Sequence, residues 1–312
     1  EAAAKALAAT PDALSLAAAQ EAWRRARAPW KRADAFLFGP ADDLAITGGV
    51  IDSGPPDDAK LLALVAAATP LDAAAVGALG GNQRGFAGLE WLWFDPEGGD
   101  SAVLAALGGA TGERRRTLGA LAAADLRAKI EAVRDAWRGG YADELAQAGR
   151  GSSAYSSERQ GIDAVVNALV SAAEIVIAIR LAKPLGLDRN PPEPHPELVE
   201  SGRADTSLAE ILHVLDGIEA TYTSTLGGAK GTSISDAVRE FQPGADDALR
   251  RDLAGAKAAT AAVTLPLRRA VAEQRDLAIA AHAACREVKR RLATEIAGAL
   301  GTSVGFNVTD GD

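Results

Sequence analysis

The chain has 312 residues, a length that suits one large domain or two of ordinary size. Its formal net charge of -9 argues against a nucleic-acid partner, because nucleic-acid-binding domains usually carry a basic face. The single cysteine, Cys285, excludes an intrachain disulfide, and the absence of any run of about twenty apolar residues argues against a membrane span.

Helix signals recur along the chain, and no segment shows the sustained apolar–polar alternation of a surface strand. The first signal is Thr10-Pro11-Asp12, in which a capping hydroxyl and an early proline predict a helix that runs to Phe38 and bends at Pro29. The other predicted helices cover the segment between Gly81 and Asp95 and residues 57–68, 112–137, 157–183, 206–226, 246–273 and 277–300. The predicted fold class is therefore all-α.

A proline-rich stretch divides the predicted helices into two groups. It opens at Pro184, passes through Asn190-Pro191-Pro192-Glu193-Pro194 and ends near Ser201. Such a composition is typical of a boundary between domains. We therefore predict two helical-bundle domains packed together, residues 1–186 and residues 187–312.

Two short basic runs interrupt this acidic chain, at residues 114–116 and 289–291. Acidic residues surround both runs, and no set of aromatic side chains lies near them for bases to stack on. We interpret both runs as solvated helix faces.

The stretch from Gly85 to Phe94 places a carboxylate, Glu90, among large apolar side chains on a predicted helix. Acidic residues seldom enter such surroundings unless they are paired. Glu90 is therefore expected either to form an ion pair or to have a functional role. The candidates for an ion-pair partner are Arg84, Arg27 and Arg32.

Four segments, in chain order, resemble the imelysin-like family: residues 30–40, 85–94, 206–222 and 300–312. The first contains Asp34, followed by an aromatic-rich turn into Gly39-Pro40. The second resembles the family's signature, in which a glycine is followed two residues later by a histidine and three further on by a glutamate. Here the glycine is Gly85 and the glutamate is Glu90, but the histidine position is Ala87.

The resemblance implies an all-helical protein that is exported to the bacterial periplasm, or anchored to a membrane by a lipid outside this chain, and that is linked to iron acquisition. Some members of the family are described as metallopeptidases, so the resemblance also implies a metal site to which Glu90 contributes, with iron or zinc as the ion. The chain begins with Glu1 and contains no methionine, as expected of a trimmed, mature form.

A histidine and a glutamate three residues apart lie on one face of a helix and can share a metal ion. Ala87 has no donor atom, so Glu90 would need another ligand, and the resemblance suggests Asp34, because the matching family position is also acidic. The predicted ligand pocket has Phe86 and Trp91 as its walls. The residues predicted to form this pocket are Gly85, Phe86, Ala87, Glu90, Trp91 and Asp34.

Three hypotheses for function follow. The first is an exported binding or accessory protein linked to iron uptake, with a degenerate metal motif, no catalytic residue and no peptidase activity. Its partner would be a small ligand or a protein of the periplasm or membrane. The second is a metal-dependent peptidase that recruits a histidine outside the motif, from among His195, His213 and His282. The third is a protein-interaction scaffold.

Overall fold

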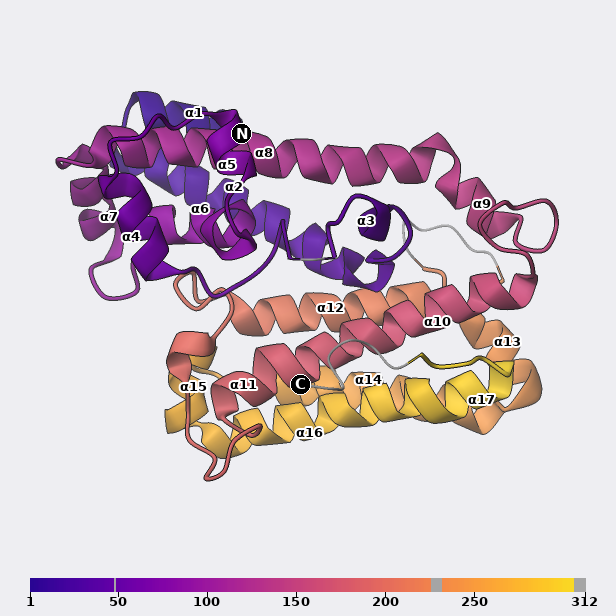
Figure 1. Ribbon diagram of the computed structural model, residues 1–312. Helices are drawn as coiled ribbons and strands as arrows, with labels where there is room; N and C mark the ends of the chain where they lie inside the picture. The colour runs from indigo at the N-terminus through magenta and orange to yellow at the C-terminus, as the bar shows by residue number, and fades with distance from the viewer. Residues whose placement is uncertain (48, 226–231, 306–312) are drawn as a thin grey trace. The chain divides into compact units, whose positions relative to one another are not determined.

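The computed structural model describes residues 1–47, 49–225 and 232–305 (Figure 1). These residues form helices and connecting loops with no strand among them, which confirms the predicted all-α class. The last segment that resembles the family, residues 300–312, is described as far as Gly305, and its remainder lies outside the described residues, as does residue 226 at the end of a predicted helix.

Contacts between Cα atoms divide the chain into two compact units. Unit 1 comprises residues 1–28, 40–136 and 197–207, and unit 2 comprises residues 29–39, 137–196 and 208–312. The chain therefore passes between the units repeatedly. The boundary expected at residues 186/187 falls inside unit 2, and the division into two sequence-contiguous domains stays a prediction.

Unit 1 is built on the long helix α8, against which α1, α5, α6 and α7 pack (Figure 1). Asp12 caps α2 by accepting a hydrogen bond from the backbone N–H of Ser15 at 2.8 Å, two residues later than the expected cap at Thr10. The helices that contribute to this unit are α1 (Ala2–Ala9), α2 (Ala13–Arg32, as far as residue 28), α3 (Pro40–Asp43), α4 (Asp58–Ala66), α5 (Ala73–Gly77), α6 (Gly85–Trp93), α7 (Gly99–Gly108) and α8 (Gly112–Ala136).

In unit 2, α10 and α14 pack against α16 (Figure 1). Several of its helices contain π-helical turns, which lie at Trp137–Tyr141, Ile175–Ala182 and Leu292–Ile296. Its helices are α9 (Ala142–Ala146), α10 (Glu158–Glu174), α11 (Lys183–Leu185), α12 (Ser207–Tyr222), α13 (Ile234–Phe241), α14 (Pro243–Ala261), α15 (Leu267–Glu273), α16 (Arg275–Arg291) and α17 (Ala297–Leu300).

The continuous helix Glu158–Leu185 is long and apolar enough to cross a membrane by length and composition. Its most apolar window is 44% buried within the protein. Val166, Leu169 and Leu181 are fully buried, so its apolar stripe supplies part of the core of unit 2. A core helix meets the same criteria as a membrane span, so this helix is weak evidence for one.

The loop after α9 is held by one carboxylate, Glu144. It accepts hydrogen bonds from the hydroxyl of Ser152 (2.7 Å) and from the backbone N–H groups of Ser153 (2.6 Å) and Ala154 (3.1 Å). These bonds, the Ser152 hydroxyl first, lower the pKa of Glu144 to about 2.

We expect a proton titration followed by NMR to give Glu144 a midpoint of about 2, with the Ser153 and Ala154 amide resonances moving at the same midpoint. A depressed carboxylate pKa adds stability above the unfolded value of 4.5, and this stability is lost as the pH falls through the folded value. Replacing Ser152 with alanine removes the largest cause and should raise the midpoint. A midpoint near 4.5 in the parent protein would contradict the expectation.

Candidate functional site

The signature glycine, Gly85, begins α6 in a conformation that favours glycine. Its φ is +57°, and the N–H of the next residue, Phe86, donates to the carbonyl of Ile51 at 2.9 Å. A Cβ atom at position 85 would lie 2.2 Å from that same carbonyl oxygen. Glycine is therefore required at position 85, because two backbone segments approach each other closely there.

Glu90 is 2% exposed and lies in the middle of α6, a helix whose nine residues are all buried. Its Oε1 accepts the backbone N–H groups of Arg203 at 2.8 Å and Ala204 at 3.2 Å. Hydrogen bonds from backbone N–H groups satisfy a buried carboxylate. Glu90 thus joins α6 to residues 197–207, a segment more than one hundred residues further along the chain.

The same segment is bound a second time by Arg27, which is 2% exposed on α2. Its Nη2 donates to Glu200 and to the hydroxyl of Ser201, both at 2.9 Å, and its Nη1 pairs with Asp52. Its guanidinium lies 4.8 Å from the centre of the Phe86 ring. Phe86, expected as a pocket wall, therefore stacks against a buried ion-pair cluster.

The other arginines considered for Glu90 have carboxylate neighbours of their own. Arg84 lies 4.0 Å from Asp125 in unit 1, and Arg32 lies 3.9 Å from Asp216 in unit 2. A direct ion pair of Glu90 with either of them stays a prediction.

Asp34 lies in the 3₁₀ turn Ala33–Phe36 and belongs to unit 2. It is 4% exposed, and its Oδ2 accepts Nη2 of Arg180 at 2.7 Å. Each predicted carboxylate is thus buried with partners in its own unit. Their joint pocket stays a prediction.

Trp91 lines a cleft of about 220 Å³ in unit 1, together with Leu92 and Phe94 of the same chain segment. Two aspartates and two arginines also reach this cleft: Asp58, Asp95, Arg115 and Arg203. Glu90, Phe86, Ala87 and Gly85 are not among the residues that line it. The apolar and charged walls together suit a small polar ligand with an apolar part.

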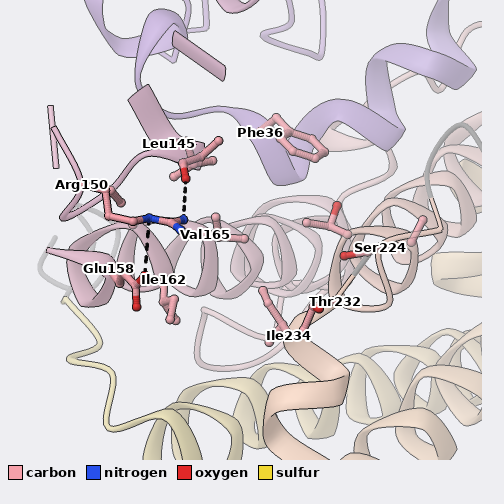
Figure 2. Close-up of a pocket in the computed structure, with 14 residues that line it drawn as sticks. Phe36, Leu145, Arg150, Glu158, Ile162, Val165, Ser224, Thr232 and Ile234 are labelled. Carbon is pink, nitrogen blue, oxygen red and sulfur yellow. Dashed lines mark hydrogen bonds and ion pairs between the residues drawn. The ribbon is translucent and has the colours of Figure 1, made fainter. Parts of the chain in front are cut away.

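A larger cavity, of about 590 Å³, lies within unit 2 (Figure 2). Apolar side chains from several elements line it, among them Phe36, Ile162 and Ile234. Arg150 lies 3.7 Å from Glu158 at its edge, and both side chains are about two-thirds exposed. This cavity was not predicted from the sequence, because its walls come from four separate parts of the chain.

The histidines all belong to unit 2, whereas the signature helix belongs to unit 1. Burial lowers the pKa of both His213 and His282, which favours their neutral form. Nε2 of His195 lies 2.9 Å from Nη1 of Arg189. Among residues 1–47, 49–225 and 232–305, no group of three or more His, Cys, Asp or Glu side chains could hold a metal ion.

The signature position therefore does not fit the metal that the resemblance suggested. Ala87 supplies no ligand atom, and Oε1 of Glu90 already accepts two backbone N–H groups. A transition-metal site needs several donors in a defined geometry. The part of the chain that the structure describes does not assemble them around Glu90.

Comparisons with known proteins agree with the fold. The family model described as imelysin, a peptidase family, matches residues 1–294. Iron-regulated protein A of Synechococcus elongatus is 25% identical over 271 residues, which cover 85% of this chain and 69% of that protein.

Two solved structures share the fold. One is described as an iron-regulated protein A precursor from Parabacteroides distasonis, with a TM-score of 0.76 and 20% identity over 95% of this chain and 86% of that chain. The other is an imelysin-like protein from Psychrobacter arcticum, with a TM-score of 0.67 and 21% identity over 94% of this chain and 83% of that chain.

Proposed function

Because the chain belongs to the imelysin family, we propose that it is an exported binding or accessory protein linked to iron uptake, without peptidase activity. The name of the Synechococcus relative, an iron-regulated protein, supports the link to iron. The description of the Parabacteroides chain as a precursor supports export to the periplasm, with or without a lipid anchor. The partner in this proposal is a small ligand or a protein of the periplasm or membrane.

The observation that carries the proposal is the environment of Glu90. A peptidase of this family would need a metal-bound water and a base within reach of it. Here the carboxylate accepts N–H groups from Arg203 and Ala204, and the position two residues after Gly85 is alanine. We infer that the role of Glu90 is structural and that it holds residues 197–207 against α6. We also infer that the metal motif is degenerate.

The predicted site residues to test are Glu90 and its neighbours on α6 in unit 1 and, separately, Asp34 in unit 2. Trp91, one of these residues, lines the 220 Å³ cleft. Iron and zinc are the metal ions to be tested for binding.

A calorimetric titration of the demetallated chain with ferrous, ferric and zinc ions tests this proposal. We expect no stoichiometric binding by the parent protein, because a single carboxylate that already accepts two hydrogen bonds is a poor site for these ions. The variant Ala87→His restores the histidine–glutamate pair and should gain binding.

Glu90→Gln, which keeps the shape and the acceptor oxygen, is measured beside these two, with Glu113→Gln as a control at an exposed position of the same unit. If the parent binds one ion per chain, and Glu90→Gln but not Glu113→Gln loses it, the proposal of a degenerate motif is wrong.

A further inference from the structure

The arginine run at residues 114–116 lies on α8, and its side chains differ in what they bind. Arg114 donates to the carbonyl of Leu64 at 2.8 Å, and Arg116 donates to the carbonyl of Leu107. Both arginines therefore hold neighbouring loops or helix ends in place. The prediction of a solvated helix face is wrong for this run.

Arg115 makes no such hydrogen bond to a neighbouring loop or helix end among the described residues. Its Nε donates to the hydroxyl of Thr111 at 3.2 Å, and its guanidinium lies 4.4 Å from the centre of the Trp91 ring. Among the described residues, its two terminal nitrogens have no hydrogen-bond or ion-pair partner. Stacking on an indole fixes a guanidinium while leaving its outer N–H groups available.

Burial lowers the pKa of Arg115, and Arg115 forms no ion pair among the described residues. Arginine stays charged in proteins even so. A partly buried charge without a counter-charge is unfavourable, and an anion that bound there would relieve the cost.

Arg115 lines the 220 Å³ cleft of unit 1, and the other charged groups there are already engaged. Nη2 of Arg203 lies 2.9 Å from both oxygens of Asp58. Asp95 accepts the backbone N–H groups of Glu97 (3.0 Å) and Gly98 (2.8 Å). Arg203 is thus neutralised by Asp58, and among the described residues Arg115 is the arginine of this cleft that has no carboxylate partner.

We propose that this cleft binds a small monocarboxylate with an apolar body, and that Arg115 holds its carboxylate. The planar guanidinium can donate two parallel hydrogen bonds to a carboxylate. Trp91, Leu92 and Val103 supply apolar surface for the rest of the ligand. The carboxylates of Asp58 and Asp95 line the same cleft and disfavour a second negative charge, so a monoanion fits better than a phosphate.

Calorimetric titration of the full chain with sodium benzoate tests the site. We expect one benzoate bound per chain, and at least tenfold weaker binding of benzyl alcohol, which lacks the carboxylate, and of acetate, which lacks the ring. Arg115→Gln should weaken benzoate binding at least tenfold. Arg25→Gln is the matched control, because it removes the same charge from an exposed position of the same unit.

Arg115→Lys provides a second variant that keeps the charge and loses the planar pair of donors. It should bind benzoate more weakly than the parent and more tightly than Arg115→Gln. No saturable binding of benzoate to the parent would overturn the proposal. So would equal affinities of the parent and Arg115→Gln, or equal affinities for benzoate and benzyl alcohol.

Discussion

Replacing Asp246 with alanine is expected to lower the free energy of unfolding by about 3–5 kcal/mol, because its fully buried carboxylate joins three parts of unit 2. Oδ1 accepts the hydroxyls of Tyr222 on α12 (2.9 Å) and Ser235 on α13 (2.6 Å). Oδ2 accepts hydrogen bonds from the guanidinium groups of Arg239 and Arg250. Alanine would leave two buried hydroxyls without their acceptor, at about 1–3 kcal/mol each.

The two arginines contribute less to this loss, because they are 50% and 39% exposed and water can replace the carboxylate. Asp246→Asn should therefore cost less than Asp246→Ala, since the amide oxygen can still accept both hydroxyls. Asp247→Ala, at the adjacent exposed position, should change stability by less than about 0.5 kcal/mol.

Urea unfolding followed by circular dichroism measures all three variants. Burial raises the pKa of Asp246, but hydrogen bonds from Ser235, Arg239, Tyr222 and Arg250 outweigh it and hold the pKa below its usual range. The carboxylate therefore stays ionised at neutral pH, and the difference between aspartate and asparagine should shrink as the pH falls through that folded pKa. Equal stabilities of Asp246→Ala and Asp247→Ala would refute this account.

Replacing Gly85 with alanine should destabilise the protein by about 2–4 kcal/mol, which combines the strain of a positive φ with a backbone collision. The new Cβ would lie 2.2 Å from the carbonyl oxygen of Ile51, and backbone cannot swing aside as a side chain can. That carbonyl also accepts the N–H of Phe86, so relief of the collision would lengthen a hydrogen bond.

Gly108→Ala is the matched control, since the last residue of α7 has no atom within 4 Å of its new Cβ. It should be neutral or should stabilise the protein by up to about 1 kcal/mol. Thermal unfolding of both variants, with their metal content measured, separates a structural role of the signature glycine from a ligand-binding one. If Gly85→Ala and Gly108→Ala have the same melting temperature, the steric role assigned to Gly85 is refuted.

Helical periodicity predicted the long elements well, because each has a buried stripe several turns long. The short helices α1, α3, α5, α7 and α9 were missed, since few turns give little periodicity. Helix α13 was missed as well, although Ser233 and Asp236 form a capping box that the sequence displays.

The burial of Glu90 was expected from its apolar neighbours, and the structure bears it out. Its partners were not foreseen, because backbone N–H groups have no signature in sequence. Arg203 and Ala204 also lie just beyond a stretch that reads as a linker. The pairing of Arg180 with Asp34 was missed for a related reason, since nothing local connects residues 146 positions apart.

The repeated passage of the chain between the two units has a consequence for the order of folding. Residues 197–207 complete unit 1. The carboxylate of Glu90 therefore lacks its N–H donors, and the guanidinium of Arg27 lacks its acceptors in this segment, until the ribosome has made these residues. Contacts so distant in sequence close large loops and slow the folding of a chain. Neither unit is a continuous fragment. Truncation after residue 136 should therefore leave the first part of the chain as a partly ordered intermediate. During synthesis, unit 1 stays incomplete until about two-thirds of the protein has been made.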